Sequence, residues 1–217
     1  MSPLIKATGV LFDWDGTLLN SFRLSYHASI KVLQHFGIKI NQKRFLETYS
    51  PNWYDSYKKL GLSPEQWDNA DRIWRKNYLS GTAELFPFTH SLLTKLKNAD
   101  LKIGLVTSGD RGRVSQEIKV FDLEKFFTVI VCSEDTLLKK PHPEPLSYAL
   151  QKLSLHAKST VYVGDRPEDI VMGKSVGSYT VGVESDYGSR SLLEQACPDL
   201  ILPDASHLTE ALELKSL

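Results

Sequence analysis

The chain has 217 residues, of which 41% are hydrophobic and 24% charged, a composition typical of globular rather than disordered or fibrous proteins. Basic and acidic residues balance at 26 each without a long basic run, so nucleic acid is not expected as a partner. No apolar stretch approaches the roughly 18 residues of a membrane span. The first residues lack a signal-peptide pattern, and two cysteines, Cys132 and Cys197, make no disulfide framework. We therefore expect a cytoplasmic protein with no membrane partner.

Short, continuous apolar runs recur along the chain and predict buried β-strands. They lie at residues 8–12, 103–106, 129–131, 160–163 and 179–183, with a sixth at 199–203. Helical patterns follow at residues 114–121, 145–153 and 167–176, and a short amphipathic helix is expected at 208–214. Strands buried on both faces are apolar throughout, and strands that alternate with helices pair in parallel. The sequence thus predicts an α/β fold with a Rossmann-like parallel sheet.

The stretch from Ser21 to Leu85 interrupts this rhythm, because it shows helical periodicity and no strand pattern. One predicted helix runs to His35 and stops at Gly37. A second starts at Ser63-Pro64-Glu65-Gln66, which combines a serine cap, proline in the first turn and a glutamine that can close a capping box. Its large aromatic residues are spaced to share one face, where core packing is the favoured interpretation: Trp67, Trp74 and Tyr78.

We therefore predict two parts. Residues 1–19 and 87–217 form the α/β core, and residues 20–86 form a helical subdomain inserted after the first strand.

Polar residues follow four of the predicted strands at their carboxyl ends, where open parallel sheets bind ligands. They are Asp13 and Asp15 after the first strand, Thr107 and Ser108 after the second, Lys140 after the third, and Asp165 and Asp169 after the fourth. Carboxylates crowded into one cleft require a cation, and hard oxygen ligands favour Mg²⁺. Hydroxyls before a helix, together with backbone N–H groups and a lysine, favour an anion such as phosphate. The set predicts phosphoryl chemistry.

At these positions the sequence resembles the haloacid dehalogenase superfamily, in its phosphatase branch with a helical cap. The matching motifs occur in the family's order: Asp13-Trp14-Asp15-Gly16-Thr17-Leu18, Thr107, Lys140-Pro141-His142-Pro143, and Gly164-Asp165 through Asp169. The resemblance implies that Asp13 attacks phosphorus to form an aspartyl-phosphate. Asp15 would protonate the leaving oxygen and then deprotonate the hydrolytic water.

The resemblance also implies the ligand set. Mg²⁺ would be held by the Asp13 carboxylate, the Asp15 backbone carbonyl and Asp165, with Asp169 acting behind them through water. Thr107 and Lys140 would hold the phosphoryl group, next to the Ser108 hydroxyl.

Structural roles compete with several of these assignments. Thr107-Ser108 could be a plain helix N-cap, and Asp169 could cap the helix that follows it. Lys139 is interpreted as a solvated neighbour of Lys140. Arg111 and Arg113 are either solvated helix charges or residues that line the cleft.

Two positions depart from the family pattern. Trp14 stands where phenylalanine or leucine is commoner and is interpreted as packing, and Asn20-Ser21 replaces the usual acidic hinge.

The resemblance implies a Mg²⁺-dependent phosphatase of small phosphorylated metabolites, similar to phosphoglycolate phosphatases. A β-phosphoglucomutase-like phosphoryl transferase and a pyrophosphatase remain alternatives, since the difference lies in the cap. A receiver-like phospho-acceptor domain shares the aspartate, metal and lysine. It is disfavoured by Asp15, by the long helical insert and by the late acidic motif.

Overall fold

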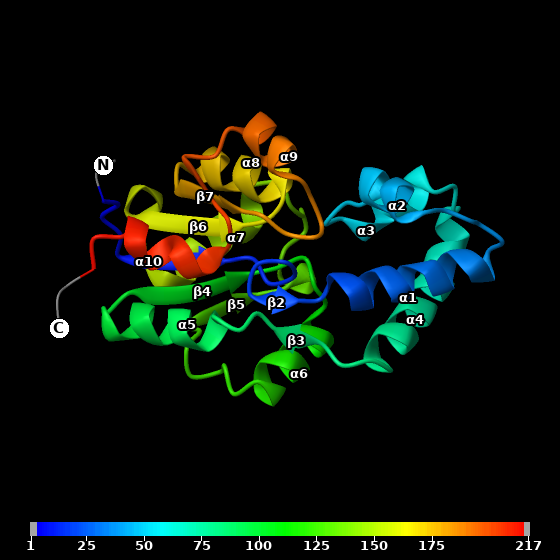
Figure 1. Cartoon of the computed structure of the whole chain (residues 1–217), viewed down its shortest axis with the longest axis horizontal. Helices are drawn as coiled ribbons and strands as arrows, with labels where there is room; N and C mark the ends of the chain where they lie inside the picture. The colour runs from blue at the N-terminus through cyan, green and yellow to red at the C-terminus, as the bar shows by residue number, and fades with distance from the viewer. Residues whose placement is uncertain (1–3, 215–217) are drawn as a thin grey trace. The chain divides into compact units, whose positions relative to one another are not determined.

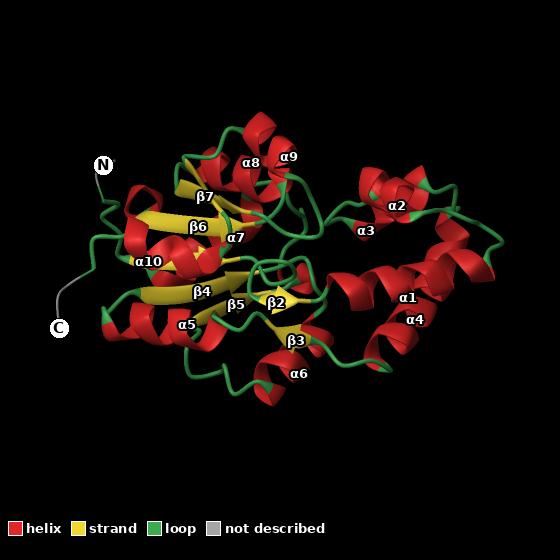
Figure 2. Ribbon diagram, viewed as in Figure 1, coloured by secondary structure: helices red, strands yellow, loops and turns green. Residues whose placement is uncertain are grey.

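A six-stranded parallel sheet forms the centre of the fold in the computed structural model, which describes residues 4–214. In spatial order its strands are β5 (Val129–Val131), β4 (Lys102–Val106), β1 (Gly9–Phe12), β6 (Thr160–Gly164), β7 (Tyr179–Val183) and β8 (Leu200–Leu202). Every neighbouring pair is parallel. The predicted α/β class with a parallel, Rossmann-like sheet is confirmed (Figures 1 and 2).

Helices cover the sheet, as the alternation of strand and helix patterns predicts. They are α5 (Thr89–Asn98), α6 (Arg111–Val120), α7 (Glu144–Leu153), α8 (Pro167–Val176), α9 (Arg190–Ala196) and α10 (Leu208–Ala211), with 3₁₀ turns at Ser133–Asp135, Ala157–Ser159 and Ala205–His207. None of the helices within residues 4–214 is both long and apolar enough to cross a membrane.

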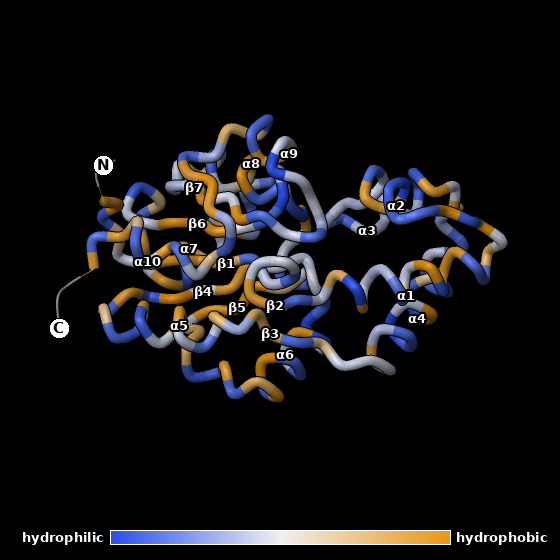
Figure 3. The backbone as a smooth tube through the Cα atoms, viewed as in Figure 1, coloured by the Kyte–Doolittle hydropathy of each residue, from blue (hydrophilic) through white to orange (hydrophobic). Residues whose placement is uncertain are grey.

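The continuous apolar runs are explained by burial on both faces of the sheet. All four residues of β1 and all five of β6 are buried. Leu11 and Tyr162 from these strands pack with Leu146 of α7 and Met172 of α8 in one core cluster. Figure 3 shows the hydrophobic colouring along the central strands.

Two predicted helix boundaries are wrong. Helix α6 starts at Arg111 rather than Val114, because the Asp110 side chain caps it by accepting a hydrogen bond from the Arg113 backbone N–H at 3.0 Å. Helix α10 ends at Ala211 rather than 214. There the chain becomes extended and pairs with Ile5, whose backbone exchanges hydrogen bonds with Ala211 and Glu213 and so removes the helical partners.

Two very short strands lie where the chain leaves and re-enters the core. Strand β2 (Leu19–Asn20) pairs with β3 (Glu84–Leu85). The prediction that no strand occurs up to Leu85 is therefore wrong at its end, since a two-residue strand is too short to show a period. The chain divides into two compact units at this point: Asn20–Glu84, and the described residues through Leu19 together with those from Leu85 onward.

The Asn20–Glu84 unit is helical. It contains α1 (Phe22–His35), α2 (Gln42–Thr48), α3 (Trp53–Lys59) and α4 (Pro64–Leu79). The predicted capping box of α4 is present, with the Ser63 N–H donating to Gln66 Oε1 at 2.9 Å.

Aromatic packing holds this unit together. Trp74 stacks on Tyr78 and Trp67 stacks on Tyr54, each with ring centroids 4.7 Å apart. The interpretation of the aromatic face as core packing is confirmed.

Leu146→Ala should lower the free energy of unfolding by about 2–5 kcal/mol, because Leu146 is fully buried in the core cluster and a cavity would remain. Val120→Ala, at a side chain that is 70% exposed, should change it by less than about 0.5 kcal/mol. Urea denaturation of both variants measures the difference. Equal losses would contradict the core described above.

Candidate active site

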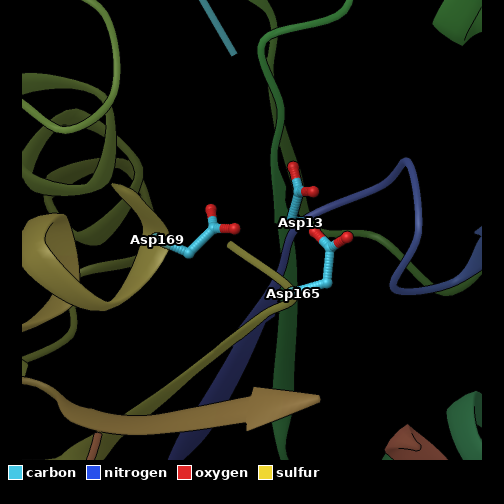
Figure 4. Close-up of side chains that lie close together, drawn as sticks. All are labelled: Asp13, Asp165 and Asp169. Carbon is cyan, nitrogen blue, oxygen red and sulfur yellow. The ribbon is translucent and has the colours of Figure 1, made fainter. Parts of the chain in front are cut away.

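Asp13 and Asp165, two acidic residues of the candidate site, follow adjacent strands of the sheet. Phe12 is in register with Val163, so Asp13 follows β1 beside the end of β6, and Asp165 follows β6. The strand order reverses here, since later strands are added on both sides of β1, and such a reversal opens a ligand crevice. Asp169 of α8 completes the group, whose candidate ligand atoms lie within 4.8 Å of one another. Figure 4 shows the carboxylates of Asp13, Asp165 and Asp169 gathered at this edge.

Lys140 is ion-paired inside this acidic group. Its Nζ lies 2.6 Å from Asp13 Oδ1 and 2.8 Å from Asp169 Oδ1. Burial alone would lower the pKa of Lys140, but the negative charges of Asp13 and Asp169 raise it well above its usual value. Lys140 therefore keeps a positive charge in direct contact with Asp13.

Asp169 caps helix α8 and also belongs to the acidic group. Its Oδ2 accepts a hydrogen bond from the Arg166 N–H at 3.1 Å, which caps α8. Its Oδ1 accepts from Lys140 and from the Tyr162 hydroxyl, the latter at 3.2 Å. Because both oxygens are engaged, the arrangement suits support of a metal from behind its direct ligands better than direct coordination.

Burial and neighbouring negative charges raise the pKa values of both Asp13 and Asp165. Burial raises the pKa of Asp13 to about 7, with Asp169 and Asp15 adding to the rise and Lys140 opposing it. Burial, followed by the charges of Asp13 and Asp169, raises the pKa of Asp165 well above its usual range. Asp165 Oδ2 accepts from Ser185 Oγ at 2.5 Å, whereas Oδ1 is buried with no hydrogen-bond partner among residues 4–214. An all-oxygen donor set with an unsatisfied carboxylate oxygen fits Mg²⁺.

Gly16 allows the loop after β1 to pass close to this carboxylate. Its φ of +83° lies in the left-handed region. A Cβ at this position would lie 2.3 Å from Asp165 Oδ2 and 2.9 Å from Tyr187 Cδ2. The glycine of the motif is therefore required both by the backbone conformation and by space.

Thr107 and Ser108 follow β4, the neighbour of β1 on the side opposite β6. Thr107 is buried, and its Oγ1 accepts a hydrogen bond from the Gly109 N–H at 3.0 Å, which leaves the hydroxyl proton available to donate. Ser108 is half-buried. The alternative that these residues cap the next helix is wrong, because Asp110 is the N-cap of α6.

Asp15 is ion-paired with Arg113, one of the two arginines for which the sequence left open whether they are solvated or line the cleft. Arg113 Nη1 and Nη2 lie 3.0 and 2.6 Å from Asp15 Oδ1 and Oδ2, and the arginine is only 6% exposed. Arg111 is instead exposed and paired with Asp135. The spacing of Arg113 and Glu117 predicts an i,i+4 pair, but no local pattern indicates a partner 98 residues away.

Two neighbouring predictions change. Trp14 is fully buried, as packing requires, but its Nε1 also donates to Glu117 Oε2 at 2.7 Å. Lys139 is half-buried rather than solvated, because its ammonium donates to the carbonyls of Ser133 and Thr136. These bonds hold the loop that presents Lys140.

Mg²⁺ should raise the melting temperature of the protein, and more at about pH 8 than at about pH 5.5. The raised pKa values of Asp13 and Asp165 favour protonated carboxyls in the folded state. Without metal, the stability that these protonated groups contribute at low pH is lost as the pH rises through the pKa of each group, which is about 7 for Asp13. A bound cation offsets the negative charge in place of the protons. The stability that it restores is therefore larger at the higher pH, where the carboxylates are ionised.

Thermal unfolding with Mg²⁺ or with EDTA at both pH values measures this effect. Asp165→Asn should reduce the Mg²⁺ shift, whereas Asp122→Asn, at an exposed aspartate on another surface, should preserve it. A shift that is the same at both pH values and in Asp165→Asn would contradict the metal site.

Comparison with known proteins identifies close relatives. The profile of a family described as haloacid dehalogenase-like hydrolase matches residues 10–183. A pyrophosphatase, PpaX, from Bacillus mycoides is 32% identical over 206 residues, covering 94% of this chain and 96% of the relative.

Solved structures share the fold. A haloacid dehalogenase-like family hydrolase from Streptococcus pneumoniae superposes with a TM-score of 0.82 at 23% identity, covering 94% of this chain and 97% of that one. A predicted phosphoglycolate phosphatase from Haemophilus somnus gives 0.81 at 23% identity with the same coverage.

Proposed function

Because the chain belongs to the haloacid dehalogenase-like hydrolase family, we propose that it is a Mg²⁺-dependent phosphatase acting on small phosphorylated metabolites through an aspartyl-phosphate. The observation that carries the proposal is the pairing of Asp13 with Lys140 at 2.6 Å, with Asp15 two residues further along the same loop. A nucleophile, a fixed positive charge and an acid are thereby supplied by one edge of the sheet.

In the first step an oxygen of Asp13 attacks phosphorus. A bond forms between this oxygen and phosphorus while the bond to the ester oxygen breaks, and Asp15 supplies the proton that the leaving oxygen takes up. Lys140 already contacts Asp13 and would contact the phosphoryl oxygens as they gather charge. Thr107 and Ser108, at the end of the adjacent strand β4, would donate hydroxyl hydrogen bonds to the same oxygens.

In the second step water attacks the phosphorus of the aspartyl-phosphate. Asp15, now ionised, takes a proton from the water, and the bond between phosphorus and Asp13 breaks. Inorganic phosphate leaves, and both aspartates return to their starting states. One residue thus serves as acid and then as base.

The metal is assigned to the Asp13 and Asp165 carboxylates and the Asp15 backbone carbonyl, with Asp169 behind them. When bound, Mg²⁺ supplies positive charge that offsets the negative charge of the carboxylates and of the phosphoryl group. The unpartnered, buried Oδ1 of Asp165 supports this assignment.

The helical unit of residues 20–84 is proposed to act as a cap that selects the leaving group. Its independent aromatic core supports this role, because a separately packed unit can move as one body.

Pyrophosphate is a second candidate substrate. The specific observation is the 32% identity with a pyrophosphatase over 94% of the chain. The same two aspartates would act, with phosphate as the leaving group in place of an alcohol.

Released phosphate should be measured on a panel of phosphoglycolate, sugar phosphates, nucleotides and pyrophosphate, with Mg²⁺ or with EDTA. The wild-type enzyme should release phosphate only with Mg²⁺. Asp13→Asn should abolish release because its amide cannot act as the nucleophile, and Asp15→Asn should lower kcat by about 10²–10⁴-fold.

Asp122→Asn serves as the control for a lost carboxylate and should retain full activity. Release that persists in Asp13→Asn would overturn the covalent mechanism. Interconversion of a sugar phosphate without release would favour the mutase, and inactivity on the whole panel would overturn the small-ester phosphatase.

A further inference from the structure

Four side chains beside the proposed nucleophile form a connected polar cluster, and the reaction steps above use only one of them, Asp15. We call it the α6 clamp; its members are Trp14, Asp15, Arg113 and Glu117. Two of them stand on the loop after β1 and two on helix α6, one turn apart.

The bond between Asp15 and Arg113 fixes an orientation as well as a charge. Both carboxylate oxygens are held, one by each Nη atom, at 3.0 and 2.6 Å. A planar guanidinium that grips a carboxylate at two points constrains the plane of the carboxylate, which a single contact does not do. The side chain of Arg113 is 5% exposed and that of Asp15 18%, so water screens the pair little.

Glu117 and Trp14 hold the arginine in turn. Arg113 Nη1 lies 3.3 and 3.2 Å from the two carboxylate oxygens of Glu117. Glu117 Oε2 also accepts the Trp14 indole N–H at 2.7 Å. Consecutive residues of the loop, 14 and 15, are therefore tied to two positions on one turn of α6.

The backbone of α6 and its preceding turn is shaped to admit the guanidinium. A Cβ at Gly109 would lie 2.3 Å from Arg113 Nη2, the nitrogen that holds Asp15 Oδ2. Because a Cβ there would also lie 2.8 Å from Cγ2 of the buried Val114, any side chain at this position would crowd both the arginine and the base of α6.

We propose that Arg113 is a positioning residue for Asp15, held in place by Glu117 and Trp14, and that it aims the Asp15 carboxyl group at the leaving oxygen. Each Asp15 oxygen accepts a hydrogen bond from Arg113 and keeps a second lone pair that can carry the proton. This inference rests on the proposed acid–base role of Asp15. Arg113 acts through Asp15 rather than on substrate, because its two Nη atoms are both occupied by carboxylates.

The test is the dependence of rate on the leaving group. An alkyl phosphate needs a proton on its leaving oxygen, whereas p-nitrophenyl phosphate has a leaving group that departs without one. Arg113→Met should lower kcat for the alkyl ester by about 10²-fold and for the aryl ester by less than about threefold, with KM nearly unchanged. Arg113→Lys should recover part of the loss, since it keeps the charge but loses the second contact.

A double-mutant cycle separates positioning from general damage. In an Asp15→Asn background, Arg113→Met should change kcat by less than about twofold, because there is no acid left to aim. Arg111→Gln, two residues earlier on α6 and paired away from the site, is the matched control and should behave as wild type.

The outcomes distinguish failure of the positioning role of Arg113 from failure of the acid–base role of Asp15. Equal losses on both esters in folded Arg113→Met and Arg113→Lys proteins, or an additive cycle, would overturn the positioning role while leaving the phosphatase standing. If Asp15→Asn itself keeps wild-type activity on the alkyl ester, the proposed function of Asp15 fails first.

Discussion

The ion pairs of Lys140 with Asp13 and Asp169 are the interaction on which the rest of the site depends. Three buried carboxylates with ligand atoms within 4.8 Å of one another repel, and their desolvation adds to the cost. One buried ammonium offsets part of this charge and at the same time contacts the proposed nucleophile. The remaining negative charge favours a divalent cation here, so the proposed metal site and the proposed phosphoryl site both follow from one electrostatic imbalance.

The fold gathers these charged residues at one edge of the sheet. Parallel strands end on the same edge, and the reversal of strand order beside β1 brings the residues after β1 and β6 together although about 150 positions separate them in sequence. Helix α8 then adds Asp169 within its first turn, where the same carboxylate also caps the helix. One side chain thus both caps α8 and places a negative charge in the acidic group.

The sequence predicts the sheet and the motif residues because both leave local patterns: apolar runs for strands, and polar residues directly after them. It does not predict that Arg113 holds Asp15, since this contact joins two distant segments and an arginine on a helix usually faces solvent. The burial of Lys139 and the early end of α10 are not predicted for a different reason. Each depends on backbone groups, of Ser133 and Ile5 respectively, that no side-chain pattern records.

The central claim is that Asp13 receives the phosphoryl group. A crystal structure of the protein with Mg²⁺ and beryllofluoride, which mimics a phosphoryl group on a carboxylate, tests this most directly. We expect beryllofluoride to be joined to Asp13, with Lys140 contacting its fluorine atoms and the cation shared with Asp165. Beryllofluoride on another residue, or a cation bound away from Asp13 and Asp165, would contradict it.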